Sequence, residues 1–402
     1  MTRISERGKR IFASPFRKYL PYADQAKARG IDVIHLNIGQ PDFLMPEGIL
    51  EKYKWTAASF VPYGIAEGEN ELRSAWAEYY RKFNIEVTSA NVMITTGASE
   101  ALQLALLAIC DPGDEVIVPE PFYANYNGFC QIAGVKIVPL PTSIDDGFPI
   151  PPNEHFEAAI SERTRCILIS NPNNPTGKIF PKEQLSQLVS LAVKHDLFLM
   201  VDEAYSEFVY REYEFFSALT FNDANEHVIV ADSVSKRFNA CGLRVGALVS
   251  RNVDLLDAIT NFSRLRLSPP MLAQLMAIEL LKSPTEYYQG VLNEFTQRRA
   301  LILSRLEGMP GVEFHAPEGA FYVFARLPID DSERFSKWLL TDFSHEGQTL
   351  MIAPGTGFYA TEGCGYNEVR IAYVLEEKRL SAALDCLERA LETYPGGITL
   401  PD

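Results

Sequence analysis

The chain has 402 residues, 47% of them hydrophobic and 22% charged, so it is long enough for two domains and can bury a large core. Its formal net charge of −15 repels nucleic acid and anionic membranes, which excludes both as favoured partners and points to a small-molecule ligand. No apolar stretch is long enough to span a bilayer and the N-terminus lacks the apolar core of a signal peptide, so we expect a cytoplasmic protein.

The first expected element is a helix over 21–30 (PYADQAKARG), which ends at Gly30 and which we expect to pack with the C-terminal part of the chain. The middle of the chain alternates short β-rich runs with longer helical patterns. This alternation is typical of a mostly parallel sheet with helices on both faces. The expected strands are residues 92–95, 115–119, 166–170, 197–203, 228–233 and 246–250.

After about residue 285 a long charged helical stretch leads to GVEFHAPEGAFYVFARL (311–327), which indicates a smaller α+β unit. We therefore predict an α/β protein with a large sheet domain over 47–285. The small domain is expected to combine 1–46 with 286–402.

The cysteines are scattered, with no CxxC pair and no histidine at ligand spacing. We expect reduced, packed thiols and no metal site. The six cysteines are Cys110, Cys130, Cys166, Cys241, Cys364 and Cys386.

Ligands of open α/β sheets bind outside the carboxyl ends of the strands, so the residues that follow each expected strand are the first candidates for a site. Gly97 permits a tight turn after strand 92–95, and Ser99 opens a helix whose free N–H groups suit a phosphate; a plain turn with Ser99 as N-cap is the alternative. Tyr123 follows strand 115–119 and can stack on a flat ring, with a core aromatic as the alternative.

Three further strand ends carry unusual residues. The loop NPNNPTG after strand 166–170 is too irregular for a simple turn. Asp202 follows four apolar residues, where an unpaired carboxylate is costly, so we expect a cationic partner; a capping or core-network role is the alternative. Lys236 follows two serines in SVSK, a pattern that most often marks a solvated loop, and Arg244 follows eight residues later.

An anion cradle, an aromatic face, a buried carboxylate and a lysine amine at one sheet edge match the needs of pyridoxal 5′-phosphate. The phosphate requires a helix N-terminus, the aldehyde a lysine, and the ring nitrogen a carboxylate that keeps it protonated. Arg244 can grip the phosphate with its bidentate fork. These residues predict Lys236 as the covalent anchor of that cofactor.

The chain resembles the fold-type I pyridoxal-phosphate aminotransferases, the class I and II enzymes of the aspartate aminotransferase superfamily, over nearly its whole length. The resemblance implies a seven-stranded type of sheet, a homodimer, and transfer of an amino group from an L-amino acid to a 2-oxo acid. Aspartate with 2-oxoglutarate is the favoured pair. The motifs that carry the resemblance, in the family's order, are NIGQPD, PYGIAEGENELR, TGASEAL, NPNNPTG, VDEAYSEF, SVSKRF, RVG and VRIAY.

For the cofactor, the resemblance implies that Lys236 forms the Schiff base and shuttles a proton, while Asp202 pairs with the pyridine nitrogen. Tyr205 and Asn174 are expected to hydrogen-bond the ring oxygen, and Tyr63 to reach the phosphate of the neighbouring subunit. The full set of expected cofactor contacts is Gly97, Ala98, Ser99, Tyr123, Asn174, Asp202, Tyr205, Ser233, Ser235, Lys236, Arg244 and Tyr63.

For the substrate, the resemblance implies that Arg370 of VRIAY binds the α-carboxylate, helped by Asn174 and by the backbone of Gly39. Without the resemblance, the alternative interpretation is that Arg370 is an exposed charge on a strand.

A dicarboxylic substrate needs a second cation. One subgroup of the family uses a lysine where this chain has Ser99. Arg264 and Arg266 precede a Ser-Pro-Pro turn, close to where other members present an arginine across the dimer interface, and we hypothesise that one of them reads an acidic side chain. Surface charges at a helix end are the alternative.

The same lysine-centred site can serve related chemistry. Aromatic or aliphatic amino acids are alternative substrates, and a C–S lyase or a decarboxylase is an alternative activity on this fold.

Overall fold

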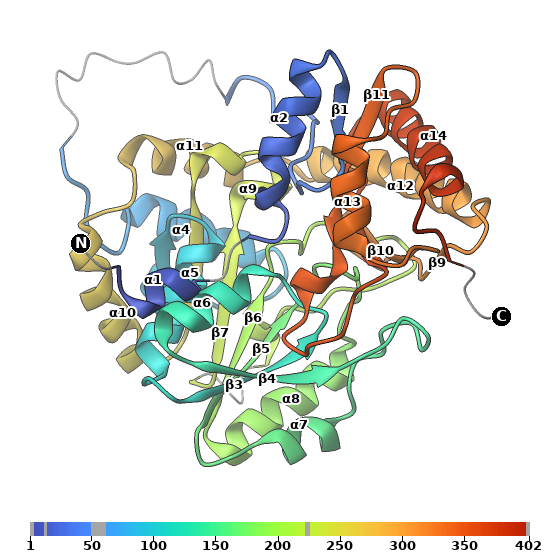
Figure 1. Ribbon diagram of the computed structural model, residues 1–402. Coiled ribbons are helices and arrows are strands. Elements are labelled where there is room, and N and C mark those ends of the chain that lie inside the picture. Colours follow the sequence, from blue (N-terminus) through green and yellow to red (C-terminus); the bar gives the residue numbers. More distant parts are fainter. Residues whose placement is uncertain (1–3, 12–13, 50–61, 222–225, 399–402) are drawn as a thin grey trace.

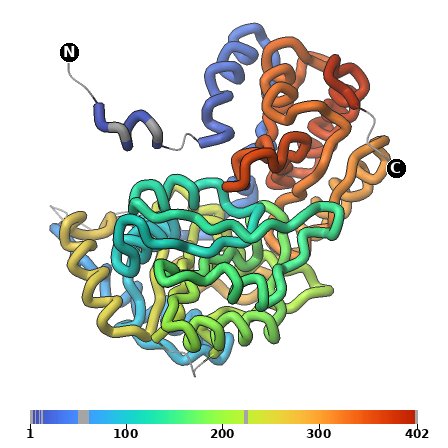
Figure 2. The backbone as a smooth tube through the Cα atoms, turned by 60° about the horizontal axis from the view of Figure 1, so that its bottom comes forward, coloured from blue at the N-terminus to red at the C-terminus, as the bar shows by residue number. Residues whose placement is uncertain are grey.

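The computed structural model describes residues 4–11, 14–49, 62–221 and 226–398 (Figure 1). The fold is α/β, as expected, with a mostly parallel central sheet. A second, smaller set of strands and helices lies beside it, built from both ends of the chain (Figure 2).

The central sheet has seven strands in the order β2-β8-β7-β6-β5-β3-β4, and β8 alone runs antiparallel to its neighbours. The sequence missed the edge strand β4, because its two prolines interrupt the β pattern; an edge position tolerates them. The strands are β2 (Val92–Thr95), β3 (Glu115–Glu120), β4 (Lys136–Pro141), β5 (Thr164–Ser170), β6 (Phe198–Asp202), β7 (Val228–Ser233) and β8 (Gly246–Ser250).

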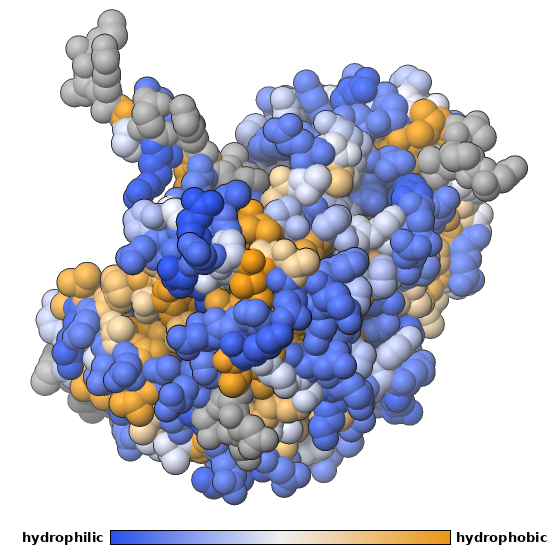
Figure 3. Space-filling view, turned by 90° about the horizontal axis from the view of Figure 1, so that it is seen from below, coloured by the Kyte–Doolittle hydropathy of each residue, from blue (hydrophilic) through white to orange (hydrophobic). Residues whose placement is uncertain are grey.

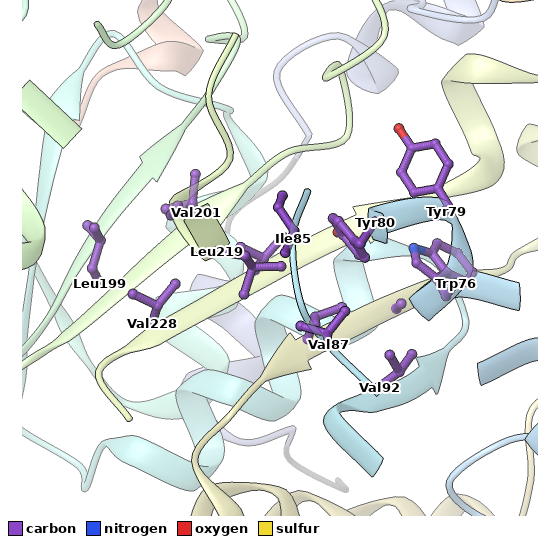
Figure 4. Close-up of a cluster of buried hydrophobic side chains, with 14 of the residues drawn as sticks. Trp76, Tyr79, Tyr80, Ile85, Val87, Val92, Leu199, Val201, Leu219 and Val228 are labelled. Atoms are coloured by element: carbon purple, nitrogen blue, oxygen red, sulfur yellow. The ribbon is translucent and has the colours of Figure 1, made fainter. Parts of the chain in front are cut away.

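The strands send alternate side chains to opposite faces of the sheet, and both faces are buried. This explains why the strand sequences are continuously apolar. Leu199 and Val201 of β6 join a cluster with Trp76 and Tyr80 from helix α4 (Figure 4). Met200, between them, packs into the cluster on the other face, under helices α5, α6 and α10. Burial on both faces fixes the register of the central strands, and with it the position of their carboxyl ends.

Helices cover both faces of this sheet (Figure 1). No helix within the described ranges is both long and apolar enough to cross a membrane. The helices associated with the large sheet are α4 (Asn70–Arg81), α5 (Ala98–Ile109), α6 (Asn125–Ala133), α7 (Asn153–Ala159), α8 (Lys182–His195), α9 (Val234–Arg237), α10 (Val253–Arg266) and α11 (Met271–Leu281).

The smaller unit has a four-stranded sheet, in the order β12-β13-β10-β9, and a parallel pair of β1 with β11. Helix α2 packs against α13, so the N-terminal helix does lie with the C-terminal part; it ends at Ala28, two residues before Gly30. Helix α1 (Glu6–Arg10) lies apart from this unit (Figure 2). The elements of the smaller unit are α2 (Leu20–Ala28), β1 (Asp32–His35), α12 (Thr285–Glu307), β9 (Glu313–Phe314), β10 (Tyr322–Arg326), α13 (Ser332–Thr341), β11 (Gln348–Met351), β12 (Ala353–Pro354), β13 (Glu368–Ala372) and α14 (Glu377–Thr393).

Candidate active site

A cavity of about 590 Å³ opens at the carboxyl edge of the central sheet, where segments of the smaller unit cover it. The strand ends that the sequence singled out converge there, because parallel strands present their carboxyl ends at one edge. The predicted site residues that line the cavity are Gly39, Ala98, Ser99, Tyr123, Asn174, Asp202, Tyr205, Ser233, Ser235, Lys236, Arg244 and Arg370.

Lys236 lies on the short helix α9, directly after β7. Ser233 caps this helix, since its Oγ accepts a hydrogen bond from the backbone N of Ser235 at 3.1 Å. The lysine Nζ donates to the carbonyl oxygen of Gly39 at 2.5 Å and lies 3.8 Å from the Sγ of Cys241. The amine is therefore held at the junction between the large sheet and the N-terminal segment.

Asp202 ends β6 and is buried. Its Oδ2 accepts from the Tyr126 hydroxyl at 3.1 Å and its Oδ1 from the Ala204 backbone N at 3.2 Å. No Lys, Arg or His among the described residues forms an ion pair with it, and burial raises the pKa of Asp202 to about 6. The carboxylate thus borders the cavity without the cationic partner that its burial demands.

The anion-binding end is formed by the start of α5 and by Arg244. The first N–H groups of α5 have no partner inside the helix they begin. Gly97, with a φ of 89°, is the N-cap and the helix begins at Ala98, so the alternative in which Ser99 is the N-cap is wrong. A Cβ on Gly97 would lie 2.4 Å from Nη2 of Arg244, so only glycine lets the guanidinium cover the turn. Arg244 donates to the carbonyl oxygens of Cys241 and Thr96.

Arg370, on β13, is a buried cation with no carboxylate partner among the described residues. It donates to Oδ1 of Asn174 at 2.9 Å and to the carbonyl oxygen of Asn37 at 2.7 Å, while its Nε is buried without an acceptor. Its guanidinium lies 4.2 Å from the ring centroid of Tyr322 and 5.2 Å from that of Phe16. A buried arginine with a free donor calls for an anionic ligand.

Two tyrosines join the halves of the site. The hydroxyls of Tyr205 and Tyr322 lie 2.7 Å apart. A Cβ on Gly39 would fall 1.8 Å from the Tyr322 hydroxyl, so glycine is required where the N-terminal segment passes this pair. Burial, followed by the charge of Asp202, raises the pKa of Tyr123 to about 12. Tyr123 therefore lines the cavity as a neutral phenol.

Besides Gly97, which forms the turn before α5, three expected site residues are not in the lining of this cavity. Tyr63 is 83% exposed. Arg264 is largely exposed and approaches Glu67 at 4.0 Å. Arg266 forms an ion pair with Glu100 at 3.1 Å and donates to two backbone carbonyls. The roles expected for Tyr63, Arg264 and Arg266 involve a neighbouring subunit. The structure contains one chain, so these roles stay predictions.

Other residues of the site escaped the sequence reasoning. Asn37 begins the motif NIGQPD and Tyr126 ends the run EVIVPEPFYANY, so both had a signal in stretches already singled out. Phe16, Arg17 and Tyr322 had none, because they reach the cavity only through packing of the smaller unit against the sheet.

These features fit pyridoxal 5′-phosphate. The unpaired Asp202 matches a protonated ring nitrogen, the start of α5 with Arg244 matches a phosphate, and the Lys236 amine is in the lining of the same cavity. The free donor of Arg370 matches the carboxylate of an amino acid. No group of three acidic, histidine or cysteine side chains in the described part of the chain could hold a metal ion.

Comparison with known proteins gives concordant results. The family model for aminotransferase class I and II matches residues 31–387. An aspartate aminotransferase of Pyrococcus horikoshii is 34% identical, with 97% of each chain covered. Among solved structures, a double mutant of the Thermus thermophilus aspartate aminotransferase is similar with a TM-score of 0.88 and 32% identity over 97% of this chain and 100% of that one. An alanine aminotransferase from Pyrococcus furiosus is similar with a TM-score of 0.86 and 31% identity over 96% and 99%.

Proposed function

The chain belongs to the class I and II aminotransferases, which use pyridoxal 5′-phosphate, and from this premise we propose that the cavity around Lys236 is the active site. The observation that carries the proposal is the buried Asp202 beside the cavity, whose carboxylate lacks an ion-pair partner in the described structure. A protonated pyridine nitrogen supplies that partner.

The cofactor would be held by Arg244 and by residues at the carboxyl ends of β2, β3, β5, β6 and β7. Lys236 would bind it covalently, Asp202 would keep its ring nitrogen protonated, and Tyr123 would stack on the ring. When bound, the cofactor supplies a ring that withdraws electrons from the substrate carbon. The phosphate would be held by Gly97, Ala98, Ser99, Ser233, Ser235 and Arg244. Asn174 and Tyr205 would donate hydrogen bonds to the ring oxygen.

The substrate would be oriented by Arg370, whose guanidinium is already aimed by Asn174 and by the Asn37 carbonyl. A prepositioned arginine binds a carboxylate with little loss of side-chain entropy. The Lys236 amine, which the Gly39 carbonyl positions, would take up and return the proton of the substrate carbon.

Aspartate with 2-oxoglutarate is the proposed substrate pair. Relatives named aspartate aminotransferase over nearly the full length support it, although a similarly close structure is named an alanine aminotransferase. For the second carboxylate, the sequence analysis suggested Arg264 or Arg266, reaching a neighbouring subunit, as one source of a cation.

A cytoplasmic homodimer is part of the proposal. Figure 3 shows hydrophobic side chains gathered on the side of the molecule where α10 lies in Figure 1. The exposed apolar residues include Leu265, Leu267 and Leu275 around the α10–α11 turn. Contiguous apolar surface of this kind is typical of subunit interfaces.

The test is the visible spectrum of the purified protein before and after L-aspartate is added without a keto acid. We expect the absorbance of the lysine-bound cofactor to convert to that of the amine form, and a Lys236→Ala variant to lose the first band. A protein that shows no band even after cofactor is added would refute the proposal.

The second candidate is transamination of aromatic or aliphatic amino acids, favoured by the absence of a lysine at Ser99. A cofactor band that ignores aspartate but responds to these amino acids would select it. Product analysis separates both from a C–S lyase or a decarboxylase, because only transamination leaves a keto acid and the aminated cofactor.

A further inference from the structure

The cavity is lined by four cations and one carboxylate. The cations are Arg17, Lys236, Arg244 and Arg370, and the carboxylate is Asp202. The proposed function occupies three of the cations, with the cofactor aldehyde, its phosphate and the substrate's α-carboxylate. Arg17 is the lining cation that has no assigned ligand.

Arg17 belongs to the 3-10 turn Arg17–Tyr19, and its side chain forms no hydrogen bond or ion pair with the described residues. The next residue behaves differently, since Lys18 pairs with Glu333 on the surface at 2.5 Å. Arginine carries five donors, and a guanidinium at a cavity wall is well suited to bind a carboxylate in a bidentate manner.

Arg17 is itself exposed, but packing holds its two chain neighbours, and Phe16 lies close to the substrate arginine. The ring of Phe16 lies 5.7 Å from that of Phe358, and the guanidinium of Arg370 lies 5.2 Å from the Phe16 centroid. The Tyr19 hydroxyl donates to the Glu333 carbonyl at 3.3 Å. The turn is thus held on both sides of Arg17.

Arg17 and Tyr123 line the same cavity, and the charge of Arg17 acts on the Tyr123 hydroxyl. Burial and Asp202 raise the pKa of Tyr123, and the charges of Arg370 and Arg17 oppose that rise. A substrate held by Arg370 next to Tyr123 therefore lies within the field of Arg17.

The other cations suggested for this task are committed or distant in this chain. Ser99 replaces the lysine that one subgroup uses, Arg266 is paired with Glu100, and Arg264 is largely exposed and is not in the cavity lining.

We propose that Arg17 binds the second carboxylate of a dicarboxylic substrate, and that it does so within its own subunit. This inference rests on the proposed function, because it presupposes that Arg370 holds the α-carboxylate. It makes Arg17 the residue that separates acidic from neutral amino acids.

The experiment is calorimetric titration of the holoenzyme with succinate, an unreactive dicarboxylate, and with butyrate, the monocarboxylate of equal carbon number. For Arg17→Gln we expect succinate to bind about 10- to 100-fold more weakly, the range of one charge-assisted contact, while butyrate binding is unchanged. Arg17→Lys should fall between. The matched control is Lys18→Gln, which removes the same charge from the neighbouring surface position and should leave both ligands unaffected.

Kinetics give a second readout. The kcat/KM for aspartate should fall by a similar factor in Arg17→Gln, with the value for alanine preserved. Wild-type affinity for succinate in Arg17→Gln, or equal losses for succinate and butyrate, would overturn the inference. A selective succinate loss in Arg264→Gln instead would assign the contact to that residue. If the wild-type holoenzyme converts no amino acid at all, it is the proposed function that fails.

Discussion

At the scale of single residues, Asp202 is the site residue whose burial costs free energy in the cofactor-free protein. It is a buried carboxylate with two hydrogen bonds and no ion pair in the described structure. Because its folded-state pKa is raised from 3.8 to about 6, the folded chain retains a proton that the unfolded chain releases between pH 4 and 6. The stability of the cofactor-free protein should therefore fall as pH rises through this window and stay lower above it.

Asp202→Asn removes that penalty while keeping the shape, since the amide can accept from Ala204 N and donate to the Tyr126 hydroxyl. We expect the cofactor-free variant to be more stable than wild type by about 2–3 kcal/mol at pH 8, for a shift of about two pKa units, and equal to it at pH 4. Urea unfolding at both pH values measures this. With cofactor bound the order should reverse, because the ring nitrogen then pairs with the native carboxylate. An equal difference at both pH values would show that the carboxyl is not perturbed.

Gly39 gives a second prediction at this scale. A Cβ would fall on the Tyr322 hydroxyl, which in turn pairs with Tyr205, and the Gly39 carbonyl holds Lys236. Gly39→Ala should lower kcat by about 100-fold, the usual effect of misplacing a catalytic group by about 1 Å. Removing the hydroxyl relieves the closest contact, so Gly39→Ala combined with Tyr322→Phe should be more active than Gly39→Ala alone. If the second change lowers activity further, the clash is not the cause.

The sequence could predict residues such as Lys236 and Asp202 because their chemistry conflicts with their setting: an amine and a carboxylate follow apolar strands. It could not predict Arg17 or Tyr322. Both lie in segments with ordinary composition, and their roles depend on contacts with residues about 200 or more positions away, such as Phe358 beside Phe16 and Gly39 beside Tyr322.

At the scale of elements, the turn from β7 into α9 is held by a buried ion pair that brackets Lys236. Arg237 pairs with Asp232 and also donates to Ser206 Oγ, and its guanidinium lies 4.4 Å from the Tyr79 ring centroid. The indole of Trp76 donates to Asp232 at 2.9 Å. This network lies under α9 and contributes no group to the cavity lining.

Arg237→Met should leave Asp232 as an unpaired buried carboxylate, at a cost of about 3–5 kcal/mol in the free energy of unfolding. Asp232→Asn in the same background should recover part of the loss, because it removes the charge that methionine cannot match. Urea unfolding of the four holoenzymes of this double-mutant cycle gives the coupling energy. Strictly additive losses would mean that the two side chains do not stabilise each other.

Element type was predictable for the central strands because burial on both faces makes them apolar throughout. It was less predictable for β4 and β1, which are short or proline-containing and lie at sheet edges, where fewer neighbours constrain the sequence.

At the scale of the whole molecule, two hydrophobic clusters pack on the central sheet and another fills the smaller unit, with the cavity between them. The sequence indicated the change of character near residue 285, but not how the N-terminal segment bridges the units. That bridge, from Phe16 to Gly39, supplies the wall with the cation whose role is proposed above.

The whole-molecule prediction concerns the proposed homodimer. Tyr63 is exposed and lies outside the cavity of its own chain, whereas Lys236 lies inside it. If Tyr63 serves the phosphate of the neighbouring subunit, Tyr63→Ala should weaken cofactor binding about tenfold, the loss of one hydrogen bond to a charged group. Lys236→Ala should abolish turnover.

Mixed dimers of these two variants distinguish the possible arrangements. In such a dimer, the cavity of the Tyr63→Ala chain keeps its own lysine and receives the intact tyrosine of the other chain. We therefore expect one site per mixed dimer to have wild-type cofactor affinity. At limiting cofactor, turnover should exceed that of either parent dimer. It should reach about half the wild-type rate, because one of the two sites is intact. If Tyr63 acted within its own chain, every site with a lysine would lack the tyrosine, and mixing would restore nothing.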